Sequence, residues 1–193
     1  MTFKLIKEEY FPSKKITVSI FEHEKTKARH IHSAYETEEN SFSVAFRTLP
    51  ENSKGIPHIL EHSVLCGSKK FPSKNLFFNM RGRNFDTFMN ACTGFETTQY
   101  PFSSIDKKGF FNLMEVYTDV VFFPTLEKET FLQEGWRYEV KTEGEEKQLV
   151  YSGVVYNEMI GAYSNPGRVS FVEMLKAVYK GSQIGRASCR ERV

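Results

Sequence analysis

The stretch "GIPHILEHSVLCG", residues 55–67, decides how the chain is interpreted, because it places two histidines and a glutamate in an otherwise apolar run. A proline near its start and a glycine after its end are typical of a short helix. On a helix, His58 and His62 lie one turn apart and project from the same face. The sequence therefore predicts a short helix that carries two imidazoles and one carboxylate, Glu61, on one side.

These three side chains suit metal chemistry. Two imidazoles on one helical face can share one tetrahedral zinc ion. Glu61 lies three residues after His58, where a carboxylate can take the proton of a water that the metal has acidified. The order His-x-x-Glu-His is the inverzincin signature, the reverse of the commoner zinc-protease motif. A pair of surface histidines beside a glutamate is the alternative, and the motif alone is only a hypothesis.

A catalytic zinc site also needs a third protein ligand and an open position. The segment "SGVVYNEMIGAYS", residues 152–164, offers Glu158, which follows apolar residues on a predicted helix whose other side chains look buried. A lone carboxylate in such surroundings is costly unless it is paired or bound to metal. An ordinary surface glutamate is the alternative, and the residues alone do not decide between the two.

Strand-like and helix-like segments are mixed along the chain. The strand-like segments, which alternate apolar and polar residues or are rich in Thr and Phe, are residues 15–35, 42–48 and 83–104. We expect the first two to form one antiparallel meander. The helix-like segments, which repeat apolar residues at helical spacing, are residues 106–124 and 151–180, the second divided by "SNPG". No βαβ rhythm is present, so we predict an α+β fold with an antiparallel sheet packed against helices.

Charge and composition narrow the function classes. The chain has 193 residues with 26 basic and 24 acidic side chains, and three of the basic and one of the acidic ones lie in residues 183–193. The rest is neutral, so no nucleic-acid partner is expected. No apolar run long enough for a membrane helix occurs, and residues 1–15 interleave acids with bases, unlike a signal or transit peptide. We therefore expect a soluble, cytoplasmic chain, and three scattered cysteines suit reduced thiols.

Four segments carry a resemblance to a known family, in this order: "HILEHSVLCGSKKFP", "FMNACTGFETTQYPFSS", "FLQEGWRYE" and "GVVYNEMIGAYS". Together they resemble the amino-terminal domain of pitrilysin-family zinc metallopeptidases, in the presequence-protease branch. The resemblance implies Zn²⁺ as cofactor, His58 and His62 as ligands and Glu61 as general base. It also implies Glu158, 96 positions beyond His62, as third ligand. It further implies two halves, each with two sheet-and-helix units, that enclose a chamber for short unfolded peptides.

The resemblance also places substrate binding on the segment "NACTGFETT", residues 90–98. An edge strand can accept a peptide as an added strand, and Asn90, Ala91 and Thr93 are the expected contributors. An ordinary strand with small packed side chains is the alternative. Cys66 could be a fourth ligand, but a small buried hydrophobe is the preferred interpretation, because a catalytic zinc keeps its fourth position for water.

The chain end does not fit the family. Residues 183–193, "QIGRASCRERV", can be encoded by a sequencing-adapter read joined in frame, so we expect a non-native tail, with a genuine basic tail as the alternative. Residues 1–182 would then be an incomplete amino-terminal metallopeptidase domain that lacks the carboxyl-terminal half. The expected function is a zinc endopeptidase for short unstructured peptides, with little activity in this fragment alone. The alternative is a noncatalytic peptide-binding or scaffolding member, which would be expected to lose a ligand or the base.

Overall fold

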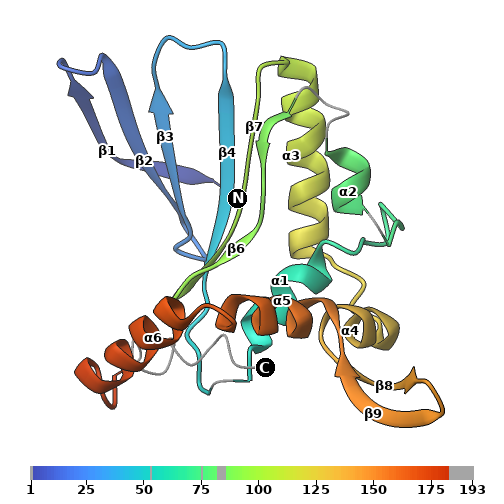
Figure 1. The fold of residues 1–193 in the computed structure, drawn as a ribbon. Coiled ribbons are helices and arrows are strands. Elements are labelled where there is room, and N and C mark those ends of the chain that lie inside the picture. The colour runs from blue at the N-terminus through green and yellow to red at the C-terminus, as the bar shows by residue number, and fades with distance from the viewer. Residues whose placement is uncertain (1, 53, 75, 82–85, 183–193) are drawn as a thin grey trace. The chain divides into compact units, whose positions relative to one another are not determined.

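The computed structural model describes residues 2–52, 54–74, 76–81 and 86–182 (Figure 1). The chain divides into two compact units, Met1–Glu38 and Glu39–Val193. The tail expected at residues 183–193 lies outside the described residues.

The amino-terminal unit is a three-stranded antiparallel sheet in the order β1-β2-β3. β2 (Ile16–His23) and β3 (Arg29–Ala34) confirm the two strands predicted within residues 15–35. The third strand, β1 (Phe3–Phe11), was not predicted from the sequence. A register shift between Leu5 and Lys7 interrupts its pairing with β2, so the strand lacks a continuous alternation of apolar and polar residues.

The second unit is built on a sheet whose central strand is β7 (Thr97–Ser104). β4 (Asn40–Arg47) pairs along one side of it, and the short strands β5 (Asp86–Met89) and β6 (Cys92–Thr93) pair with it on the other. The prediction that residues 42–48 extend the first meander is wrong, because β4 belongs to this second sheet. Apolar packing explains the pairing: the rings of Phe42 and Phe102, opposite each other in register, have centroids 5.5 Å apart.

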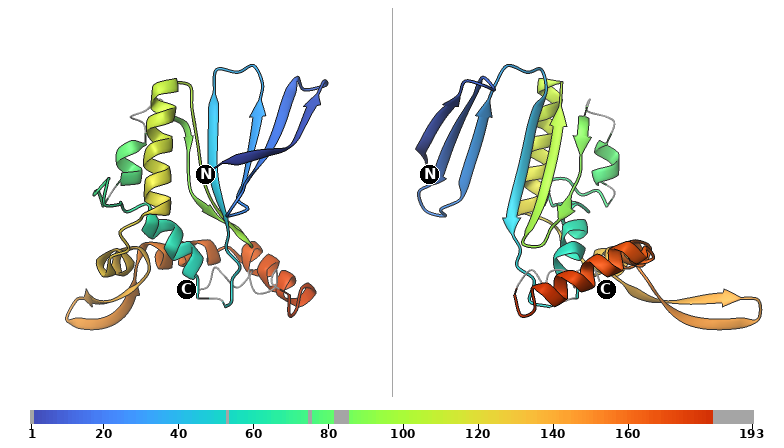
Figure 2. Two further views of the ribbon diagram at one scale, coloured as in Figure 1. Left: turned by 180° about the vertical axis from the view of Figure 1, so that it is seen from behind. Right: turned by 60° about the vertical axis from the view of Figure 1, so that its left-hand side comes forward.

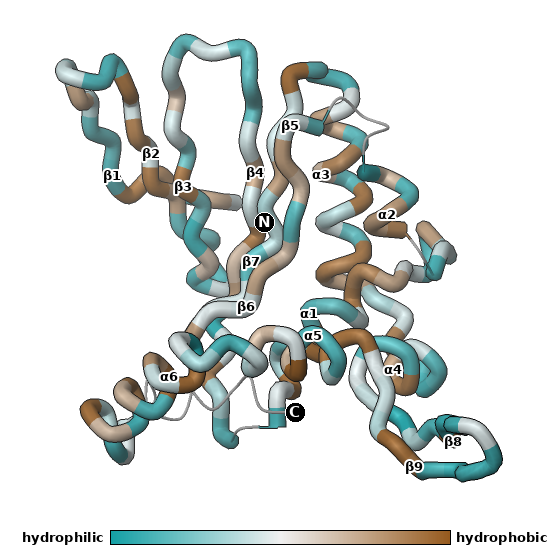
Figure 3. Tube along the Cα trace, in the orientation of Figure 1, coloured by the Kyte–Doolittle hydropathy of each residue, from teal (hydrophilic) through white to brown (hydrophobic). Residues whose placement is uncertain are grey.

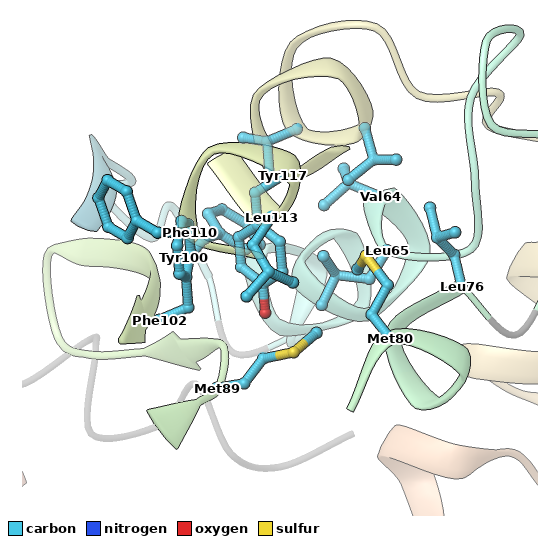
Figure 4. Packing of buried hydrophobic residues seen from close by; sticks show 12 residues of the cluster. Val64, Leu65, Leu76, Met80, Met89, Tyr100, Phe102, Phe110, Leu113 and Tyr117 are labelled. Carbon is cyan, nitrogen blue, oxygen red and sulfur yellow. The ribbon is translucent and has the colours of Figure 1, made fainter. Parts of the chain in front are cut away.

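Helix α3 (Lys107–Phe122) covers one face of this sheet (Figure 2). The helix begins where Asp106 accepts a hydrogen bond from the Gly109 amide at 2.5 Å, which caps it. Its apolar face packs on β7, where Tyr117 and Phe102 are fully buried. α1 (Ile56–Val64) and α2 (Leu76–Met80) complete the core with Leu65, and the side chains interdigitate as Figure 4 shows. The helix predicted within residues 106–124 is thus confirmed.

The carboxyl-terminal part of this unit alternates helices with a hairpin. Its elements are α4 (Lys128–Glu134), β8 (Arg137–Glu143), β9 (Glu146–Ser152), α5 (Val154–Tyr163) and α6 (Pro166–Val178). The last two confirm the helices predicted within residues 151–180, and the fold is α+β as expected.

The two ends of the β8–β9 hairpin meet at a pair of glycines. A Cβ atom on Gly153 would lie 2.1 Å from the carbonyl oxygen of Gly135, so the two backbones touch. Only a residue without a side chain fits there. This contact brings the end of α4 beside the start of α5.

Along each helix, apolar residues are interspersed with polar ones and do not form continuous apolar runs (Figure 3). The longest helix of the described residues, α3, has 16 residues. None of the helices in the described part of the chain combines the length and the apolar character that a membrane crossing needs.

Candidate metal centre

The His-x-x-Glu-His motif lies on α1, as the sequence predicts. Gly55 precedes the helix with a φ of 66°, a left-handed conformation that glycine adopts without strain, and Pro57 occupies the first turn. Ile59 and Val64 are buried and anchor the helix on the rest of the unit. The two histidine side chains stay partly exposed, at 14% for His58 and 23% for His62, where a ligand can reach them.

The structure brings together the four side chains that the sequence nominates for the metal site. The side-chain atoms of His58, Glu61 and His62 that could bind a metal lie within 4.8 Å of one another. Oε2 of Glu158, on α5, lies 3.6 Å from Nε2 of His58 and 3.5 Å from Nε2 of His62. Residues 96 positions apart in the sequence therefore meet at one point.

The burial argument for Glu158 was wrong, although its position is as expected. The Glu158 side chain is 51% exposed, and on α5 only Val155 and Met159 are buried. The apolar residues around Glu158 in the sequence include Val154 and Ile160, which are themselves exposed. The carboxylate is held near the histidines by the placement of α5 and not by a need to escape an apolar interior.

A further carboxylate, that of Glu134, contacts the ring nitrogen of His62 that faces away from Glu158. Glu134 ends α4 and is 8% exposed, and its Oε2 lies 3.3 Å from Nδ1 of His62. Gln133 donates a hydrogen bond of 2.9 Å to the other oxygen of the same carboxylate. A proton on Nδ1 donated to Glu134 leaves the lone pair of Nε2 pointing toward Glu158, the arrangement that metal-bound histidines commonly show.

Glu134 was not singled out from the sequence. It lies in "FLQEGWRYE", where the same rule that selected Glu158 applies, namely that a carboxylate among apolar residues needs a partner. The rule describes Glu134 better than it describes Glu158, because the carboxylate of Glu134 is buried and paired with His62.

The carboxylates around His62 change its proton affinity. Burial lowers the pKa of His62, but the hydrogen bond to Glu134 and the negative charges of Glu61 and Glu158 outweigh burial, so the pKa lies above the usual value. The hydrogen bond from His62 in turn lowers the pKa of Glu134. Three carboxylates therefore surround the two histidines, an arrangement that suits a cation.

Cys66 follows the motif by one turn but lies apart from the converging atoms. Its Sγ contacts the carbonyl oxygen of His62 at 3.6 Å. Burial, together with the charge and hydrogen bond of Glu134, raises the pKa of the Cys66 thiol to about 12. A thiol that stays protonated at neutral pH packs as a small hydrophobe and is a poor metal ligand, because zinc binds the thiolate.

A cavity of about 730 Å³ opens beside the motif. The histidines and carboxylates line one part of it, and apolar side chains that include Leu65, Phe77 and Met159 line another. The segment from Asn90 to Phe95 borders it as well. A cavity of this size, with an apolar wall beside a group of charged and polar side chains, suits an organic ligand such as a peptide segment.

The segment predicted to bind peptide lies at an edge of the sheet. The amides of Asn90 and Gly94 donate to Pro101 and Thr97 of the β7 strand at 3.0 Å and 2.7 Å. In an antiparallel pair such contacts recur at every second residue, so the backbone groups of the alternate residues between Asn90 and Gly94 point away from β7.

Ala91 and Thr93 occupy these alternate positions, where their backbone groups can face an added strand. Their place on the cavity rim fits the expectation, and peptide binding by Asn90, Ala91 and Thr93 stays a prediction. Asn90 is also tied to the core, because its carbonyl oxygen accepts a hydrogen bond from the Tyr117 hydroxyl at 3.4 Å.

The comparisons with known proteins identify the family and the fold. Residues 47–166 match the insulinase family of peptidases, peptidase family M16. The match covers more than half of the chain, includes the His-x-x-Glu-His motif and reaches Glu158. The chain belongs to this family.

Two curated relatives show how much of a longer protein the chain represents. It is 43% identical to the mitochondrial presequence protease of Eremothecium gossypii over 178 residues. The aligned segment covers 92% of this chain and 18% of the relative. The chain is 49% identical over 161 residues to Protein HypA of Clostridium perfringens, covering 82% of this chain and 16% of that protein. The chain therefore spans less than a fifth of the length of these relatives.

The fold also matches a solved structure. The crystal structure of pitrilysin superposes with a TM-score of 0.67 over 95% of this chain and 18% of that one, at 14% sequence identity. At this identity the likeness shows the fold, and it confirms the expected pitrilysin-type arrangement of sheet and helices.

The cytoplasmic location expected from the sequence is wrong. The presequence proteases of Eremothecium gossypii and Mus musculus are both named as mitochondrial. The Mus musculus protein is 47% identical to this chain over 155 residues, which are 80% of this chain and 15% of the relative. The expectation came from the composition of residues 1–15. The chain spans less than a fifth of the length of these relatives, so the composition of residues 1–15 is not evidence for or against a leader sequence.

Proposed function

We propose that the chain is the metal-bearing part of a zinc-dependent endopeptidase that hydrolyses short unstructured peptides. The observation that carries the proposal is the approach of Glu158 to both His58 and His62, at 3.6 Å and 3.5 Å. Membership of a peptidase family supports the reaction class. The cavity and the edge of β6 support a peptide substrate.

The side chains present fit a zinc ion. Ligand atoms about 2.0–2.2 Å from a tetrahedral zinc are separated from each other by roughly 3.3–3.5 Å. The distances from Glu158 to His58 and His62 are close to that separation. Two histidines and one glutamate are a known catalytic donor set that leaves one position open. His58, His62 and Glu158 would hold the metal, which when bound lowers the pKa of water and polarises a carbonyl group.

Glu61 is the candidate general base. It lies on the same helix as the histidines, a carboxylate oxygen lies within 4.8 Å of their ring nitrogens, and it is 5% exposed on the cavity wall. A carboxylate at this place can accept the proton of the attacking water and return it to the departing amine. Glutamine at the same position keeps the shape but cannot accept that proton.

The edge of β6 is the candidate substrate track. A peptide that pairs with the outward backbone groups of Ala91 and Thr93 would run along the cavity rim past Glu61. Pairing through the backbone gives affinity with little dependence on sequence, which suits unfolded peptides of varied composition.

Catalysis needs more than the described residues provide. Donors that stabilise the developing oxyanion are required, and the family resemblance places them, an arginine and a tyrosine, in a carboxyl-terminal half. The chain spans 18% or less of the relatives described above, so that half would be supplied by further polypeptide. By this proposal the full protein is the active enzyme, and the 193-residue chain is a feeble one.

A noncatalytic peptide-binding member of the same family is the competing function. The test is to express the uninterrupted polypeptide, load it with zinc, and follow cleavage of a quenched unstructured peptide beside the Glu61→Gln variant. Cleavage that the variant abolishes is expected. A full-length protein that binds the peptide and zinc without cleaving it would support the noncatalytic alternative.

A further inference from the structure

Three threonine hydroxyl groups form a row that ends on Glu61. Oγ1 of Thr93 donates a hydrogen bond of 2.5 Å to Oε2 of Glu61. Oγ1 of Thr98 lies 3.3 Å from that of Thr93, and Oγ1 of Thr48 lies 2.8 Å from that of Thr98. The row therefore connects β6, β7 and the residue after β4 to the carboxylate on α1.

The direction of the row follows from proton counting. A hydroxyl group has one proton to donate. Since Thr93 gives its proton to Glu61, the contact between Thr93 and Thr98 requires the proton of Thr98. The contact with Thr48 then requires the proton of Thr48. All three protons point toward the carboxylate, and donors in series polarise one another. The 3.3 Å contact is longer than usual for two hydroxyl groups and is the weakest part of the row.

The sheet fixes the position of these hydroxyl groups. Thr93 and Thr98 are directly opposite in the register of β6 and β7, and Thr98 is 3% exposed. The amide of Thr48 donates to the carbonyl oxygen of Glu96 at 2.7 Å, which ties it to the segment before β7. Threonine is also stiff at χ1 because it branches at Cβ. The donor that faces Glu61 is thus held by paired strands and buried neighbours.

We propose that Thr93 is a positioning residue whose hydroxyl group holds the carboxylate of Glu61 in the orientation for proton transfer, with Thr98 and Thr48 behind it. This inference rests on the proposed role of Glu61 as general base. It gives the side chain of Thr93 a task other than peptide binding, because its one proton is already engaged. The backbone of Thr93 still faces the open edge, so β-pairing with a peptide is a separate property.

The first test needs neither zinc nor activity. In the metal-free 193-residue chain, Thr93→Val should lower the melting temperature by about 3–10 °C, because a buried carboxylate loses a donor. Thr93→Ser should retain most of the stability, since it keeps the hydroxyl group. In a Glu61→Leu background, Thr93→Val should cause no further loss. Thr142→Val, which removes a hydroxyl group from the exposed hairpin, is the matched control. Equal losses in both backgrounds would overturn the proposal.

The second test uses the zinc-loaded, uninterrupted polypeptide. Thr93→Val should lower kcat by about 10- to 100-fold with KM and zinc content unchanged, because part of the general-base contribution depends on orientation. Thr93→Ser should restore kcat. A rise in KM with kcat unchanged would show that the Thr93 side chain binds peptide and would overturn the proposal. An inactive wild-type protein would contradict the proposed function, and the stability test would still decide whether Thr93 and Glu61 are coupled.

Discussion

His62 and Glu134 link the His-x-x-Glu-His helix to the end of α4, with Nδ1 of the imidazole 3.3 Å from Oε2 of the carboxylate. The contact joins residues 72 positions apart and leaves the other ring nitrogen facing Glu158. A proton that Nδ1 donates to Glu134 would hold the ring in this orientation and leave Nε2 as the nitrogen for a metal. Histidine ligands depend on such partners, whose loss commonly weakens metal binding 10- to 100-fold.

We therefore expect Glu134→Gln to lower zinc affinity by about 10- to 100-fold, because the charged acceptor for the His62 Nδ1 proton is lost. The measurement is competition for zinc with a chromophoric chelator. Glu129→Gln is the control, since Glu129 lies on the same helix and is exposed. Equal affinity in the Glu134 variant and the control would show that the contact does not support the metal site.

The proposed roles of Glu61 and His58 differ in their effect on metal content. Glu61→Gln should retain zinc, because the base is not a ligand, whereas His58→Ala should lose it. Metal analysis after dialysis distinguishes the two variants. Equal loss of zinc from both would reverse the assigned roles.

The fragment itself should be a feeble peptidase. Losing one oxyanion donor typically costs about 10²- to 10³-fold in rate, and by the proposal both donors lie elsewhere in the polypeptide. The measurement compares zinc-loaded residues 1–182 with the uninterrupted polypeptide on a quenched unstructured peptide. Robust turnover by the fragment that Glu61→Gln abolishes would show that the essential groups lie within this sequence.

Peptide capture at the β6 edge can be tested without disturbing Glu61. Ala91→Pro removes a backbone donor that faces away from β7, so it should weaken peptide binding by roughly tenfold, about the value of one hydrogen bond. Proline at Thr93 would also remove the hydroxyl group on Glu61 and is a poorer choice. Binding of a labelled peptide to the Glu61→Gln protein gives the affinity. An unchanged affinity, with the fold retained by circular dichroism, would argue against strand addition.

The two cysteines of the described residues should differ in reactivity. The pKa of Cys66 is raised to about 12, so its thiolate is scarce at pH 8 and alkylation should be far slower than for an ordinary thiol. Burial also raises the pKa of Cys92, but this residue is exposed and should react first. Mass spectrometry after timed iodoacetamide treatment measures the order. The rate at Cys66 should rise with pH as the thiolate forms, and rapid labelling at pH 8 would contradict the assignment.

The sequence predicts those features whose cause is local. The helix of α3 follows from its apolar spacing, and the placement of His58 and His62 follows from one helical turn. The partner of β4 could not be predicted in the same way. Alternation identifies a strand but not the strand with which it pairs, and Phe42 meets Phe102 only after two helices have intervened.

The candidate site shows the same division. Its helix motif is visible in five consecutive residues, whereas the approach of Glu134 to His62 depends on how α4 packs against α1. Glu158 was selected for a burial that the structure does not show. The hydroxyl group of Thr93 on Glu61 depends on sheet register, which no local pattern of β6 reveals.

The contact between Gly135 and Gly153 separates the hairpin from the site. In the sequence, Glu134 comes immediately before Gly135, and Glu158 follows Gly153 on α5. The residues between the two glycines form the β8–β9 hairpin, which extends away from the contact and returns to it. The hydrophilic tip of the hairpin (Figure 3), where Gly144 has open space around it, can therefore change length without moving either carboxylate. An affinity tag or a fluorescent reporter inserted at Gly144 should leave both acids in place, so the hairpin is a natural attachment point for engineering this domain.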